Sequence, residues 1–152
     1  MSEAVMSKIT CAALAIFILL GCSEKVVDSS IIQYRDTLVY LPNQTDPYTG
    51  TVAYYYPNGQ LQAKEHYADG TVNGLRQEWY KNGQSRAEKT IKDRKLIGLY
   101  REWYENGKLR TEKTYKNGKE DGLYRTWYRN GQISAEWAYV DGMVNGLFVV
   151  VK

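Results

Sequence analysis

The chain has 152 residues, 43% of them hydrophobic, which is enough for one domain with a core and too little for two. Twenty basic and 17 acidic residues give a net charge of +3, and this balance excludes the concentrated basic surface of a nucleic-acid-binding protein. The chain contains fourteen Tyr and four Trp but only two Phe. Because Tyr and Trp suit half-buried positions, we expect a thin structure with much of its aromatic surface near water.

Residues 1–21 have the features of a bacterial signal peptide. Lys8 precedes an apolar run from Ile9 to Leu20. As a helix this run would be about 18 Å long, too short for a bilayer core of about 30 Å. It ends in Leu-Leu-Gly followed by Cys22, which resembles the lipobox of bacterial lipoproteins, where the chain is cut before the cysteine and that cysteine is lipidated. The alternative is a short buried helix with an incidental cysteine.

The lipobox predicts a mature protein held in a membrane by acyl chains on Cys22, since each buried methylene contributes about 0.8 kcal/mol. Residues 22–36 then form the lipidated cysteine and a tether. Ser23 after the cysteine resembles outer-membrane sorting in Gram-negative bacteria. We therefore expect a lipid-anchored protein of the bacterial cell envelope, on the periplasmic or surface side of the outer membrane if the organism is Gram-negative. Translation can start at Met1 or at Met6, which would give a cleaner basic start.

Residues 37–55 are expected to form strands that cap the N-terminal edge of an array over residues 56–152. The array repeats every 24 residues, and such a period is the signature of a repeat architecture. Each unit has a Tyr, an Asn-Gly pair two residues later, and a further Gly that recurs with the same 24-residue spacing. These positions are Tyr56, Tyr80, Tyr104 and Tyr128; Asn58-Gly59, Asn82-Gly83, Asn106-Gly107 and Asn130-Gly131; and Gly50, Gly74, Gly98, Gly122 and Gly146.

An Asn-Gly pair between alternating segments predicts a two-residue type I′ hairpin turn, because that turn needs positive φ at both central residues. Each unit is therefore expected to be a β-hairpin with Tyr80 opposite Ser85, unless a bulge shifts the pairing. A second turn leads to the next unit, and the one at Asp93-Arg94 is expected to differ because it lacks glycine. Further along, the same pairing places one Arg opposite one Glu in each of two units: Arg101 with Glu112, and Arg125 with Glu136.

Aromatic and polar residues fall on both faces of these hairpins, which favours a single layer over a sandwich with polar outer faces. We expect an all-β protein, a single-layer antiparallel meander of four 24-residue hairpins, preceded by the signal-peptide helix. Its stability would come from contacts between neighbouring units. The apolar segment 147–151 is expected to close the array or to lie in a dimer, because an exposed apolar edge strand pairs with other chains.

The repeated pattern W-Y-x-N-G-x-L-x-x-E-x-x-Y-x-x-G resembles the variant MORN repeat. Pro47-Tyr48-Thr49-Gly50 followed by Y-Y-Y-P-N-G resembles the beginning of the array in bacterial lipoproteins of that family. The resemblance covers roughly residues 46–152. It implies a fold of stacked hairpins, roles in protein scaffolding and membrane association, and no catalytic residues. Some members of the family are assigned to toxin–antitoxin systems as antitoxin-like components.

We interpret the protein as a non-catalytic binding and scaffolding module for a protein partner, with glycans or lipid head groups as other ligands and no nucleic acid. Aromatic residues and Arg are enriched at interfaces, although the same residues could be the packing layer of the repeats. The candidate binding residues are Trp79, Trp103, Trp127, Arg101, Arg125, Tyr104 and Tyr128.

An antitoxin or immunity protein is the second interpretation. An envelope glycan hydrolase is less favoured, because catalytic residues are seldom repeated and the carboxylates recur at one position of the unit. A single histidine, His66, and no cysteine after Cys22 leave no set of residues for a metal or a nucleophile, so we expect no enzyme and no cofactor.

Overall fold

The computed structural model describes residues 25–146. They form twelve strands and one 3-10 helix: β1 (Val26–Asp28), η1 (Ser29–Ile31), β2 (Gln33–Arg35), β3 (Leu38–Tyr40), β4 (Gly50–Tyr55), β5 (Leu61–Ala68), β6 (Thr71–Trp79), β7 (Ser85–Lys92), β8 (Lys95–Trp103), β9 (Leu109–Lys116), β10 (Lys119–Trp127), β11 (Ile133–Val140) and β12 (Met143–Val144). The expected signal-peptide helix, Cys22 and the apolar segment 147–151 lie outside the described residues.

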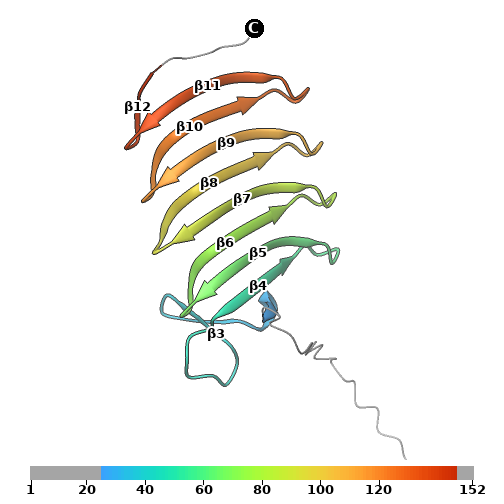
Figure 1. Cartoon of the computed structure of the whole chain (residues 1–152). Coiled ribbons are helices and arrows are strands. Elements are labelled where there is room, and N and C mark those ends of the chain that lie inside the picture. The colour runs from blue at the N-terminus through green and yellow to red at the C-terminus, as the bar shows by residue number, and fades with distance from the viewer. Residues whose placement is uncertain (1–24, 147–152) are drawn as a thin grey trace, which may run out of the picture.

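Strands β4 to β12 pair in chain order, each antiparallel to the next, and β1 adds to β4 in parallel. Successive hairpins lie side by side in one layer, with the cap hairpin β2–β3 at the N-terminal end (Figure 1). The expected single-layer meander of four hairpins is thus confirmed. The first of them consists of β4 and β5, so the array begins before residue 56.

The Asn-Gly turns differ from the expected two-residue type I′ turn. Gly83 N donates to the carbonyl of Tyr80 at 2.9 Å, Tyr80 N donates to the carbonyl of Gln84 at 2.8 Å, and φ is positive at Gly83 but not at Asn82. This is a three-residue loop, a type I turn followed by a left-handed glycine. Its cause is local: Asn82 Oδ1 accepts a hydrogen bond from Gln84 N at 3.0 Å, which holds the asparagine in the turn.

The longer loop makes the expected pairing wrong at the turn, where Trp79 and not Tyr80 lies opposite Ser85. A bulge then follows, at Arg86, and Glu78 pairs with Ala87 as expected. The bulge cancels the one-residue shift in pairing that the longer loop introduced. Because the same compensation occurs in every unit, the two predicted Arg–Glu pairs further along are confirmed, Arg101 with Glu112 and Arg125 with Glu136.

Type I′ turns occur instead at the opposite end of the hairpins. Both central residues have positive φ at Asp69-Gly70, Asn117-Gly118 and Asp141-Gly142. The turn at Asp93-Arg94, expected to differ, has the same conformation, with φ of 49° and 62°. Arg94 therefore occupies a left-handed position where the other units carry glycine. The pairing of the flanking strands imposes this shape on the turn whether or not glycine is present.

The cap is larger than expected, because residues 26–35 lie in the supposed tether and yet are folded. Strand β1 pairs with β4, and β2 pairs with β3. Val39 N donates to the carbonyl of Gly70 at 2.9 Å and so joins the cap hairpin to the array. The interpretation of residues 22–36 as a tether is therefore wrong for residues 26–35.

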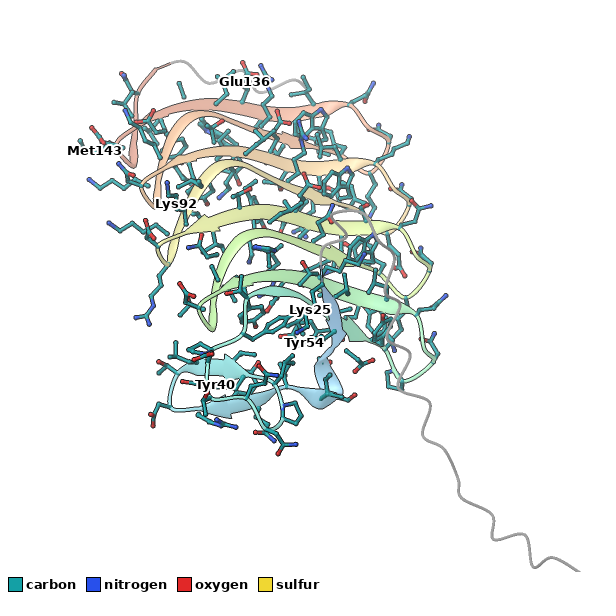
Figure 2. All side chains as sticks on the ribbon, turned by 60° about the horizontal axis from the view of Figure 1, so that its bottom comes forward. Lys25, Tyr40, Tyr54, Lys92, Glu136 and Met143 are labelled. Atoms are coloured by element: carbon teal, nitrogen blue, oxygen red, sulfur yellow. The ribbon has the colours of Figure 1, made fainter. Side chains whose placement is uncertain are left out.

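The hydrophobic core lies between the cap and the first hairpin. Its four buried residues are Val39, Tyr48, Val52 and Tyr67. Figure 2 shows the cap hairpin, marked by Tyr40, beside the end of the sheet that carries Tyr54, and Met143 at the far end. Beyond the cap, most strand residues are only partly buried, so neighbouring hairpins stabilise one another through one layer of side chains.

Candidate binding surfaces

The two faces of the sheet carry different rows of side chains, because alternate strand residues point to opposite sides. We call one the ladder face; its rows are an aliphatic row (Leu75, Leu99, Leu123), a charged row and an aromatic row (Tyr55, Trp79, Trp103, Trp127). We call the other the tyrosine face; its aromatic residues are Tyr54, Tyr67, Tyr100, Tyr115, Tyr124, Trp137 and Tyr139. Equivalent residues of successive units are about 9–10 Å apart, two strand spacings.

The charged row of the ladder face crosses seven strands with each side chain directly opposite the next. In order it consists of Lys64, Gln77, Glu88, Arg101, Glu112, Arg125 and Glu136. Arg101 Nε donates to Glu112 Oε2 at 2.9 Å, Arg125 Nη1 lies 3.8 Å from Glu112 Oε1, and Arg125 also pairs with Glu136. Two of the predicted binding residues, Arg101 and Arg125, are therefore already bound to carboxylates of the sheet.

The aliphatic row is the exposed part of this face. Leu75, Leu99 and Leu123 are 44%, 39% and 42% exposed, and Tyr55 and Ile133 are exposed on the same face. The predicted binding residues Trp79, Trp103 and Trp127 are only partly exposed, and they lie opposite Ser85, Leu109 and Ile133. The face thus has an open row of leucines beside a row of paired charges.

The tyrosines at the Asn-Gly turns join neighbouring units. The hydroxyls of Tyr56, Tyr80 and Tyr104 donate to the backbone carbonyls of Trp79, Trp103 and Trp127 at 2.8, 2.7 and 2.8 Å. The predicted binding residue Tyr104 is therefore a structural contact between hairpins. Tyr128 is 49% exposed, and the equivalent carbonyl for it belongs to residue 151, outside the described residues.

On the tyrosine face, two carboxylates and two guanidinium groups alternate near the cap. Arg76 Nη1 lies 2.6 Å from Glu65 Oε1, Arg76 Nε lies 2.8 Å from Glu78 Oε1, and Arg86 pairs with Glu78. Both Glu side chains are 9% exposed. Burial opposes ionisation of Glu78, but the hydrogen bond from Arg86 and the charges of both arginines outweigh it and lower its pKa.

Two tyrosines complete this network. The hydroxyls of Tyr54 and Tyr67 donate to Glu65 Oε2 at 3.2 and 2.8 Å and lie 3.0 Å from each other. Burial raises the pKa of both, and the negative charge of Glu65 adds to the rise. The phenols therefore stay protonated, as donors to the carboxylate.

A cavity of about 390 Å³ opens over the network, between the cap and the first two units. Its lining includes Tyr34 from the cap, Tyr56, Trp79 and both arginines. Sequence reasoning missed this cavity because it placed Tyr34 in a tether. The signal that could have found it is departure from the repeat: Glu65 and Arg76 stand where later units have Lys or Trp and Tyr.

No group of three His, Cys, Asp or Glu residues that could hold a metal ion occurs within residues 25–146. The only histidine, His66, lies on the ladder face with Nδ1 3.4 Å from Thr51 Oγ1. Over the same range, no helix has the length and apolar character needed to span a bilayer.

Four stretches of the chain match the family model of the MORN repeat variant, at residues 48–69, 72–93, 96–117 and 120–141. Each match covers one of the four hairpins, from within two residues of the start of its first strand to the type I′ turn after its second. No curated protein matches the chain. The matched positions coincide with the 24-residue units and confirm the resemblance drawn from the sequence.

Proposed function

Because this chain belongs to the MORN repeat variant family, whose repeats generally form non-enzymatic binding modules, we propose that it is a lipid-anchored module of the bacterial cell envelope that binds a protein partner on its ladder face. The observation that carries the proposal is the exposed row of Leu75, Leu99 and Leu123. The leucines lie two strands apart, with Thr90 opposite Leu75 and Thr114 opposite Leu99, and exposed apolar side chains gathered on one face mark protein interaction sites.

A protein fits this face better than the other two ligand classes. Sugar rings stack on exposed aromatic rings, whereas the most exposed row here is aliphatic and the Trp side chains are partly covered. Anionic lipid head groups need unpaired cations. On this face Arg101 and Arg125 are each paired with glutamates. Paired charges beside a leucine row can instead fix the register of a protein partner.

The anchor is proposed from Cys22 and its upstream apolar run. Strand β1 begins at Val26, so only a few residues separate it from the cysteine. At roughly 3.5 Å per residue, an extended segment of this length reaches about 14 Å. Lipidation at Cys22 would therefore hold the capped end of the array close to the membrane.

The test of the binding surface is a triple variant, Leu75→Ser, Leu99→Ser and Leu123→Ser, in the full chain expressed in bacterial cells. Cross-linking in intact envelopes, followed by mass spectrometry, identifies proteins that are joined to the wild type in fixed stoichiometry. We expect one such partner and its loss in the triple variant. The matched control is Ile31→Ser, which removes an exposed aliphatic side chain from the cap. A partner that the triple variant retains, or that the control also loses, would contradict the proposal.

The anchor is tested separately by labelling cells with radioactive palmitate. We expect the wild type to incorporate palmitate and the Cys22→Ala variant to incorporate none. Absence of label in both forms would contradict the proposed lipid anchor. An antitoxin or immunity role makes a different prediction, that the cross-linked partner stops cell growth when it is expressed alone. If co-expression of this chain restores growth, that role replaces the scaffolding one.

A further inference from the structure

We infer that the cavity between the cap and the first two repeat units binds a neutral sugar ring. The cavity lies on the tyrosine face, opposite the proposed protein-binding face, so this inference does not depend on the proposed function. With about 390 Å³ it falls at the small end of the range of ligand sites, about 300–1,000 Å³. One or two pyranose rings fit this space, and a longer chain would extend out of it.

The charges of the cavity favour an uncharged ligand. Its two buried carboxylates, Glu65 and Glu78, and its two guanidinium groups, Arg76 and Arg86, compensate one another. Each of the four carboxylate oxygens already accepts a hydrogen bond or contacts a guanidinium nitrogen. A ligand with a net charge would have to break one of these pairs in a partly desolvated place, at a cost of several kcal/mol.

The hydrogen-bonding groups of the cavity favour a polyhydroxylated ligand. Arg76 uses Nε and Nη1 and Arg86 uses Nε and Nη2 for the glutamates, so each arginine keeps N–H donors for another acceptor. The ion pairs hold both guanidinium planes in place before a ligand arrives, which reduces the entropy lost on binding. Gln62 and the hydroxyl of Tyr34 add groups that can both donate and accept.

Aromatic side chains supply the apolar surface that the C–H faces of a sugar need. Tyr34, Tyr54 and Tyr56 line the cavity, and Tyr34 is 65% exposed. Polar groups in fixed positions, surrounded by aromatic walls, match the two kinds of surface of a pyranose ring. The later units cannot repeat the site, because tyrosines occupy the positions equivalent to Arg76 in β8 and β10. Within residues 25–146 there is therefore one such site, at the capped end of the array.

The experiment uses the purified full chain in a zwitterionic detergent, since detergents with sugar head groups would compete. Glucose, galactose, mannose and N-acetylglucosamine are titrated while intrinsic protein fluorescence and saturation-transfer NMR are recorded. We expect saturable binding of at least one of these sugars. We expect Arg86→Ala to weaken it by about tenfold or more, the loss of a hydrogen bond to a charged donor. Tyr34→Ala, a change at an exposed side chain that leaves the core intact, should weaken it as well.

The matched control is Arg110→Ala, which removes the equivalent arginine one unit further along, outside the cavity. It should leave sugar binding unchanged. Absence of saturable binding for all four sugars would overturn the inference. So would equal weakening by Arg110→Ala, or wild-type affinity in both Arg86→Ala and Tyr34→Ala. Glucuronate tests the charge argument: tighter binding of glucuronate than of glucose would show that the site selects an anion and would overturn the assignment to a neutral ring.

Discussion

The phenol hydroxyl of Tyr104 donates a 2.8 Å hydrogen bond to the backbone carbonyl of Trp127, 23 residues later in the chain. The bond leaves the hairpin of Tyr104 and ends on the next one. Asn106 Nδ2 makes a parallel bond, at 3.0 Å, to the carbonyl of Arg129. In the units of Tyr80 and Tyr104, the Y-x-N-G part therefore forms its own turn and also binds the following unit.

This relationship predicts that Tyr104→Phe lowers the free energy of unfolding by about 1 kcal/mol, the value of a typical hydrogen bond in a protein. Because the aromatic ring is kept, packing changes little, and the loss of stability measures the contribution of the hydroxyl group. Urea unfolding followed by circular dichroism of the full chain measures it. Tyr55→Phe is the control, because Tyr55 is 46% exposed and carries no such inter-hairpin bond. Equal stability of Tyr104→Phe and wild type would show that the contact contributes nothing.

A second prediction concerns the turn in which Arg94 has φ of 62°. A residue with a Cβ loses roughly 1–2 kcal/mol in the left-handed conformation, whereas glycine adopts it without strain. Arg94→Gly should therefore raise the free energy of unfolding, by roughly 0.5–1 kcal/mol once the greater entropy of glycine in the unfolded chain is counted. Thermal and urea unfolding measure the gain. Arg94→Ala keeps the Cβ and should show no gain; stabilisation by both substitutions would assign the effect to the lost charge instead.

The repeat architecture could be predicted from the sequence because its signals are local and occur four times. The 24-residue step, the alternation and the turn residues fix the order of the strands and, through it, the pairing of Arg101 with Glu112. The type of each turn could not be predicted so well. The Oδ1 atom of Asn82 accepts a hydrogen bond from Gln84 N. This local contact favours the three-residue loop over the type I′ turn that the Asn-Gly dipeptide also permits.

The cavity could not be predicted because it depends on contacts between segments distant in sequence and on residues that do not repeat. Tyr34 meets the array only because β2 and β3 fold over the first hairpin, and nothing in the short segment 33–40 specifies that packing. The ladder face shows the reverse case. The sequence predicts that Arg101 faces Glu112 and that Arg125 faces Glu136, but the register alone does not show that these ion pairs already occupy the two candidate binding residues.

The two charge networks of the sheet predict different costs of losing an arginine. Arg76 lies between Glu65 and Glu78, whose side chains are each 9% exposed, and Arg76→Met leaves buried Glu65 without a guanidinium partner and Glu78 with Arg86 alone. We expect a loss of about 3 kcal/mol in the free energy of unfolding. Arg125→Met removes a pair with Glu136, which is 30% exposed, and should cost below about 1 kcal/mol. Urea unfolding of both variants measures the difference, and similar losses would show that burial does not distinguish the networks.

The buried phenols of Tyr54 and Tyr67 predict that the protein loses stability at alkaline pH. Burial raises the pKa of both above the ordinary value of 10.0, and Glu65 adds to the rise, so the folded state holds its phenolic protons to higher pH than the unfolded state does. The stabilisation from these groups is complete below pH 10 and is lost as the pH rises through the pKa of the folded state, because the unfolded chain then binds fewer protons. The midpoint of urea unfolding should therefore fall steeply above pH 10. Tyr54→Phe removes one of the two ionising groups and should make that fall shallower, whereas an equally steep fall in the variant would place the titrating groups elsewhere in the sheet.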